Sequence, residues 1–140
     1  MSNSSVLTYH PEGATGQRFE ARTALGHTLQ MDSGDGAVAA SPVDVVLAAL
    51  GSCSGMDVIA ILRKQRQDVV SYEVRLESER RTEHPRIFTR IEVRHIVRGR
   101  GISEAALKEA IRLSDTKYCT VHAILHASAE IHSSYEIVEL

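Results

Sequence analysis

The sequence predicts an α+β fold, in which helices and strands occur in separate runs rather than in the regular alternation of a doubly wound sheet. Three observations support this prediction. Short β-branched and aromatic segments occupy residues 5–32, a long apolar stretch with helical spacing covers 42–67, and two alternating segments lie within 71–99. The 140 residues are enough for one domain with a core, so we expect a single domain over 1–140.

The N-terminal segments are expected to form a small sheet. Residues 5–10, 17–22 and 26–32 are short and strand-like, and Gly-containing turns separate them. They predict an antiparallel β-meander over 5–32. A flexible link over 34–41 leads to the next element.

The stretch after this link carries a strong helix start. Ser41 suits the N-cap, Pro42 suits the first helical position, and Asp44 lies in the first turn, where the helix dipole favours an anion. The apolar residues cover nearly the whole circumference, which is typical of a helix buried on all sides. We therefore expect a long, buried central helix over 42–67.

The second half of the chain predicts a hairpin, two helices and a final strand. Polar and apolar residues alternate in 71–80 and 87–99, which indicates a long antiparallel hairpin with one face in water. Ser103 is a suitable N-cap for helical spacing that continues to 128, and the strand 129–139 ends the chain.

Composition argues against several classes of partner. The net charge of −2 and the absence of Trp give no reason to expect nucleic acid. The first residues lack the features of a signal peptide, and Asp57 interrupts the best candidate for a membrane-spanning stretch. We therefore expect a cytoplasmic protein that binds neither nucleic acid nor membranes.

Cys53 lies among residues that form helices poorly. Gly51, Ser52, Ser54 and Gly55 surround it in the middle of the apolar helix, and each Gly costs about 1 kcal/mol in a helix interior. Small residues at such a place indicate that another element or a ligand approaches the backbone closely. A buried cysteine can also be a small packing residue, so both interpretations stay open.

Cys119 is the other cysteine, and it precedes a short apolar helix. Lys117 lies nearby, so both the helix dipole and a cation are expected to lower the pKa of the thiol. In a reducing compartment a permanent disulfide with Cys53 is improbable. The two thiols instead suit a nucleophile and a resolving partner that form a transient disulfide.

Two other groups near the cysteines are weaker candidates. His122 and His126 share one helix face with Cys119, but this spacing alone does not predict a metal site, and we expect no metal. Asp57 lies one turn after Cys53, where an unpaired carboxylate would raise a thiol pKa. We expect it to pair with an arginine.

Three stretches of the chain resemble the OsmC/Ohr superfamily, and most closely its YhfA-like branch. They are SPVDVVLAALGSCSGMDVIAILRKQRQDV, ESERRTEHPRIFTRIEVRHIVRG and LSDTKYCTVHAIL, and the likeness covers almost the whole chain. The resemblance implies antiparallel sheets around a long buried helix, in two chains that intertwine as a homodimer. It also implies an active site on each side of the dimer interface.

The resemblance further implies a thiol-dependent peroxidase that acts in oxidative-stress defence. The cysteine matching Cys53 attacks an organic or hydrogen peroxide, and the cysteine matching Cys119 resolves the sulfenic acid as a disulfide. An external dithiol, often a lipoyl protein, then reduces the disulfide, and no bound cofactor takes part.

The N-terminal part of the peroxidase site differs from the family pattern. Peroxidase members carry Glu directly after the helix-starting Pro, whereas this chain has Val43 there and a carboxylate on Asp44. One residue turns a helical side chain by about 100°. Asp44 is therefore a possible supporting residue only, and neither Arg18 nor Arg22 is assigned as the family's arginine.

Two other functions remain as alternatives. The chain could be a non-enzymatic or hydrophobic-ligand-binding protein that keeps the fold and the dimer without efficient peroxidase activity. A hot-dog-type thioesterase also wraps a sheet around a long helix, and it would need Asp44 or Asp57 as its general base.

Overall fold

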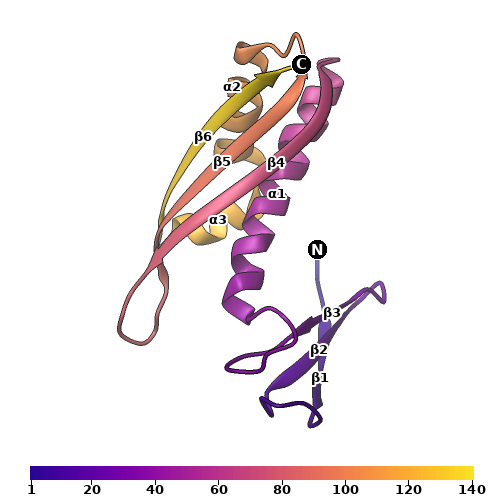
Figure 1. The fold of residues 1–140 in the computed structure, drawn as a ribbon, viewed down its shortest axis with the longest axis vertical. Helices are drawn as coiled ribbons and strands as arrows, with labels where there is room; N and C mark the ends of the chain where they lie inside the picture. The colour runs from indigo at the N-terminus through magenta and orange to yellow at the C-terminus, as the bar shows by residue number, and fades with distance from the viewer. The chain divides into compact units, whose positions relative to one another are not determined.

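The computed structural model describes residues 1–140 and confirms the α+β class, with two three-stranded sheets and three α-helices (Figure 1). The contacts within the chain divide it into two compact units, residues 1–48 and 49–140. The helix α1 (Pro42–Lys64) begins in the first unit and continues in the second. Each unit is described in turn.

The first unit holds an antiparallel sheet in the order β1-β2-β3. Its strands are Ser5–His10, Arg18–Thr23 and Thr28–Met31. Strand register aligns apolar side chains in two rows on one face, Leu7–Ala21–Leu29 and Tyr9–Phe19–Met31. The other face carries polar residues such as Thr8, Glu20 and Gln30. Alternation with a period of two therefore produces an amphipathic sheet.

The α1 helix begins as the sequence predicts and ends three residues earlier. The backbone N–H of Asp44 donates to the Ser41 hydroxyl at 3.2 Å, which caps the first turn. At the other end, Arg66 has a φ of 57°, and the N–H of Gln67 donates to the carbonyl of Leu62. This left-handed residue closes the helix after Lys64.

The second unit holds the sheet β4-β5-β6, with strands Asp68–Arg80, Phe88–Arg100 and Glu130–Glu139. β4 and β5 form the antiparallel hairpin, but β6 pairs with β5 in parallel, from Arg90 opposite Glu130. The expectation of purely antiparallel sheets is therefore wrong. The helices after β5 return the chain to the start of that strand, so β6 runs in the same direction.

Helices cover one face of this second sheet (Figure 1). After β5 come α2 (Glu104–Leu113), the π-helical turn η1 (Ser114–Tyr118) and α3 (Thr120–His126). The core between the helices and the sheet is apolar. It consists of Val58, Leu62, Val97, Ile102, Leu107, Ala110 and Ile111. The uncovered face is charged, and Arg94 pairs there with Glu136 at 3.2 Å.

Two glycines let α1 approach β4 closely. A Cβ atom on Gly51 would lie 2.6 Å from a methyl group of Leu76, and one on Gly55 would lie 3.3 Å from Val74. A larger side chain at these positions would therefore require Leu76 and Val74 to move or the helix to shift. The small residues around Cys53 indicated that either another element or a ligand approaches the helix backbone. The structure shows an element, the strand β4, next to the two glycines.

The expectation that α1 is buried on all sides is wrong for the single chain. Its buried residues lie on one face, namely Leu50, Gly51, Ser54, Val58 and Leu62. Met56 on another face is 69% exposed, although the sequence is apolar there too. The sheet and the other helices can cover only one side of a helix, so the apolar pattern exceeds what this chain buries.

By length and composition, α1 could also cross a membrane. We expected Asp57 to interrupt such a stretch, but one carboxylate within an otherwise apolar helix does not lower its hydropathy enough. The core helices of soluble proteins meet the same criterion, so this property is weak evidence for a membrane span.

We predict that Gly51→Val destabilises the protein by about 1–3 kcal/mol, because the added methyl groups would collide with Leu76. Urea unfolding measures the change. Ala105→Val is the control, because Ala105 is a helical residue that is exposed. The double variant G51V/L76A should recover part of the loss. Equal effects of G51V and A105V would contradict the close approach.

Candidate functional site

The second unit brings the two cysteines together from positions 66 residues apart in the sequence. Cys53 lies on α1, and Cys119 is the N-cap residue of α3. The Cys53 side chain interacts with the Cys119 thiol and helps to raise its pKa. Cys53 is half-buried, Cys119 is only 4% exposed, and both are free thiols. The arrangement offers one accessible and one buried sulfur.

The environment of Cys119 differs from the sequence prediction. Burial raises the pKa of its thiol to about 12, and Cys53 and the charge of Asp57 add to the rise. The N–H of His122 donates to the sulfur at 3.3 Å and acts in the opposite direction. The ammonium of Lys117 lies over the Tyr118 ring, 5.1 Å from its centroid. The expected lowering of this pKa is therefore wrong, because desolvation outweighs the helix terminus.

A cluster of two buried hydroxyls and one half-buried carboxylate lies beside the thiols. The hydroxyl of Ser114 donates to the carboxylate of Asp57 at 2.9 Å, and it lies 3.3 Å from the hydroxyl of Ser54. Ser54 and Ser114 are fully or almost fully buried. The expected partner of Asp57, an arginine, is thus replaced by a serine of η1. Sequence spacing could not show this contact, since 57 residues separate the two side chains.

A second carboxylate pairs with a histidine in the same region. Asp115 Oδ1 lies 3.9 Å from His122 Nε2, and burial raises the pKa of Asp115 while Ser133 and His122 act to lower it. The rings of His122 and His126 lie 5.5 Å apart. No three His, Cys, Asp or Glu side chains gather so that they could hold a metal ion.

A tyrosine–histidine pair joins the neighbouring strands β4 and β5, and the sequence did not predict it. The Tyr72 hydroxyl and Nδ1 of His95 are 2.5 Å apart, and Nε2 of His95 has no hydrogen-bond partner. Burial lowers the pKa of His95 to about 4. Burial, and then the charges of Asp115 and Asp57, raise the pKa of Tyr72. Tyr72 belongs to the apolar positions of the alternating stretch 71–80, but nothing in the sequence marked His95 as its partner.

The other candidate residues lie in the first unit. Asp44 is exposed in the first turn of α1, and a supporting role for it stays a prediction. Arg18 pairs with Glu12 at 3.0 Å and donates to Gln30 at 3.1 Å. Both partners of Arg18 belong to the first unit and are exposed.

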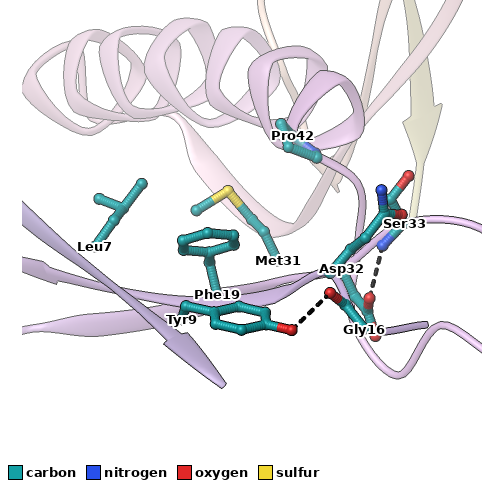
Figure 2. Close-up of a pocket in the computed structure, with 9 residues that line it drawn as sticks. Leu7, Tyr9, Gly16, Phe19, Met31, Asp32, Ser33 and Pro42 are labelled. Carbon is teal, nitrogen blue, oxygen red and sulfur yellow. Dashed lines mark hydrogen bonds between the residues drawn. The ribbon is translucent and has the colours of Figure 1, made fainter. Parts of the chain in front are cut away.

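The first unit also contains an apolar cavity of about 550 Å³ (Figure 2). Its lining includes Leu7, Tyr9, Phe19, Met31 and Pro42. At its edge the carboxylate of Asp32 accepts hydrogen bonds from Thr15, from the N–H of Ser33 and from the N–H of Val38. These bonds lower the pKa of Asp32, which suits a structural carboxylate. The alternating apolar residues of the three strands are the signal that could have predicted this cavity.

The chain is thus an α+β protein with two cysteines. One thiol is half-buried on the long helix, and the other is buried at the start of a short helix. The chain belongs to the family of OsmC-like proteins, whose family profile matches residues 33–134. This finding confirms the resemblance found in the sequence. The Escherichia coli K12 protein YhfA is 48% identical over 123 residues, which are 88% of this chain and 92% of YhfA.

Solved structures of this family share the fold. An OsmC-like protein from Mycoplasma pneumoniae superposes with a TM-score of 0.81 at 14% identity, over 99% of this chain and 98% of that one. An organic hydroperoxide resistance protein OsmC from Legionella pneumophila has a TM-score of 0.64 at 12% identity, and the match covers 97% of both chains. At these identities the likeness concerns the fold alone.

We predict that His95 makes the protein less stable in acid. Its folded pKa of about 4 is lower than the ordinary value of 6.5, so its contribution is complete above pH 6.5 and is lost as the pH falls toward 4. One pKa unit corresponds to about 1.4 kcal/mol, so the full loss is about 3 kcal/mol. Urea unfolding at pH 7, 5.5 and 4 measures it.

The variant His95→Leu should lose this part of the pH dependence, whatever its stability at pH 7. His27→Leu is the control, because His27 is exposed in the first unit, and it should keep the wild-type dependence. A pH dependence that is the same in H95L and the wild type would show that His95 does not cause it.

Proposed function

We propose that this protein is a thiol-dependent peroxidase that reduces organic or hydrogen peroxides in the cytoplasm, as part of a defence against oxidative stress. The observation that carries the proposal is the apposition of Cys53 and Cys119, the only two cysteines of the chain. Membership of the OsmC-like family supports it, since proteins named for organic hydroperoxide resistance share this fold.

The exposure of the two thiols suggests which one reacts first. Cys53 is half-buried and can be reached from outside, whereas Cys119 is almost completely buried. In the proposed reaction the Cys53 thiolate attacks one peroxide oxygen, the O–O bond breaks, and an alcohol or water leaves. Cys53 is then a sulfenic acid.

The environment of Cys119 suits the second step. Its raised pKa keeps it a thiol at neutral pH, so it is a poor first nucleophile. When it attacks the sulfenic sulfur of Cys53, an S–S bond forms, the S–O bond breaks, and water leaves with the thiol proton. An external dithiol, for example that of a lipoyl protein, then reduces the disulfide, and no bound cofactor or metal is required.

The exposed side of α1 supports a homodimer as the working form. Met56 and its neighbours leave an apolar face uncovered on the helix that carries Cys53. Exposed apolar surface of this kind is typical of an association site. A second copy of the chain would bury it and would enclose the accessible side of Cys53.

The second candidate is a protein that binds a hydrophobic ligand and has little peroxidase activity. Two observations favour it. The first unit has an apolar cavity of about 550 Å³, and Val43 stands where peroxidase relatives carry a Glu. In addition, the negative charge of the Asp57 carboxylate acts on the Cys119 thiol and disfavours its thiolate form.

We predict that one equivalent of cumene hydroperoxide links Cys53 to Cys119, because the two thiols already face each other. Peptide mass spectrometry after rapid quenching detects the bond. C119S should stop at a sulfenic acid on Cys53, which a dione reagent such as dimedone traps, and C53S should consume no peroxide above the buffer rate.

Two results would contradict the peroxidase. One is the absence of both the disulfide and the sulfenic acid in the wild type, and the other is equal peroxide consumption by the wild type and C53S. If a long-chain fatty acid then bound with micromolar affinity and Phe19→Ala weakened it, the ligand-binding function would be favoured.

We predict that Met56→Lys weakens self-association, because it places a charge on the uncovered apolar face. Sedimentation velocity at several concentrations should show a dimer for the wild type and a larger monomer fraction for M56K. Lys108→Glu, on the exposed side of α2, is the control and should leave the dimer intact. A monomeric wild type would contradict the homodimer.

A further inference from the structure

Ser114 connects the segment that carries Cys53 to the segment that carries Cys119. It is the first residue of η1 and is completely buried. Its hydroxyl lies 2.9 Å from Oδ2 of Asp57 and 3.3 Å from Oγ of Ser54. Its carbonyl accepts the N–H of Cys119 at 2.9 Å. One residue therefore contacts both sides of the proposed site.

The direction of these hydrogen bonds follows from the number of protons. A carboxylate can only accept, so the single proton of the Ser114 hydroxyl is donated to Asp57. The Ser114 oxygen then keeps lone pairs that face the hydroxyl of Ser54. A hydrogen bond to a charged acceptor inside the protein is among the stronger ones. It ties η1 to α1.

The other end of the connection is a single backbone bond. The N–H of Cys119 donates to the carbonyl five residues earlier, which is the π-helical pattern and is frequent at functional sites. On α1, Ser54 directly follows Cys53 and Asp57 lies one turn later, so the same turn of helix holds the anchor and the first cysteine. The position of Ser114 thus sets where Cys119 lies relative to Cys53.

We propose that Ser114 is a positioning residue for disulfide formation: it holds Cys119 beside Cys53 through its side-chain bond to Asp57 and its backbone bond to Cys119. This inference rests on the proposed function. A disulfide requires Cα atoms within about 4.4–6.8 Å, so a small displacement of η1 would slow bond formation. In that step Cys119 loses its thiol proton to the departing hydroxyl of the sulfenic acid, water forms, and the two sulfurs join.

The test measures the effective concentration of the two thiols without any peroxide. The purified protein is equilibrated with glutathione and glutathione disulfide, and the fraction of Cys53–Cys119 disulfide is read by mass spectrometry. We expect S114A to lower the effective concentration by about tenfold or more, the equivalent of one charge-assisted hydrogen bond. Thr116→Ala is the matched control, since its hydroxyl donates to Arg112 inside the same helical segment.

Two variants of Asp57 separate position from charge. D57N keeps an oxygen that accepts from Ser114, so its effective concentration should stay within about twofold of the wild type. The pKa of Cys119, read from the pH dependence of its alkylation, should fall because the charge is gone. D57A removes the acceptor and should behave like S114A; it also replaces S114A if that variant does not fold.

Equal effective concentrations in S114A, T116A and the wild type would overturn the inference, and so would equal losses in D57N and D57A. Failure of the proposed function would give a different result. In that case the glutathione equilibrium would still form the Cys53–Cys119 disulfide, whereas hydroperoxide would not.

Discussion

The close approach of α1 to β4 is the constraint on which the rest of the second unit depends. Gly51 and Gly55 have no side chain to separate the helix from Leu76 and Val74, so the backbone of α1 lies against the side chains of β4. The loss of helix propensity at two glycines is offset by the apolar area that this contact buries. Cys53 lies between them and is carried to the edge of the buried region.

The close packing of α1 also surrounds the thiols with polar groups that are partly removed from water. Asp57 on α1 meets Ser114 on η1, and the carboxylate charges of Asp57 and Asp115 reach Tyr72. Asp57 accepts a hydrogen bond from Ser114, and the Tyr72 hydroxyl bonds to His95, which offsets part of the cost of removing these groups from water. Desolvation then dominates the titration of the region, which explains why the pKa of Cys119 is raised although it precedes a helix.

The apolar surface that the chain leaves uncovered follows from the order of its elements. Three strands with helices on one face form a layer, and a helix in such a layer can bury only the side that faces its neighbours. The exposed side of α1 is still apolar, as Met56 illustrates. In the proposed homodimer this exposed apolar side of α1 forms the interface, and Cys53 lies beside it on the same helix.

The sequence by itself determined the α+β class, the helix start at Ser41 and Pro42, and the two cysteines as the residues of interest, because caps, periodicity and rare residue types are local signals. The tertiary structure alone decided the parallel pairing of β6, the Asp57–Ser114 bond and the raised pKa of Cys119. Each of these depends on residues dozens of positions apart or on removal from water. Neither long-range contacts nor burial can be read from the local sequence, because both arise only when separate elements pack together.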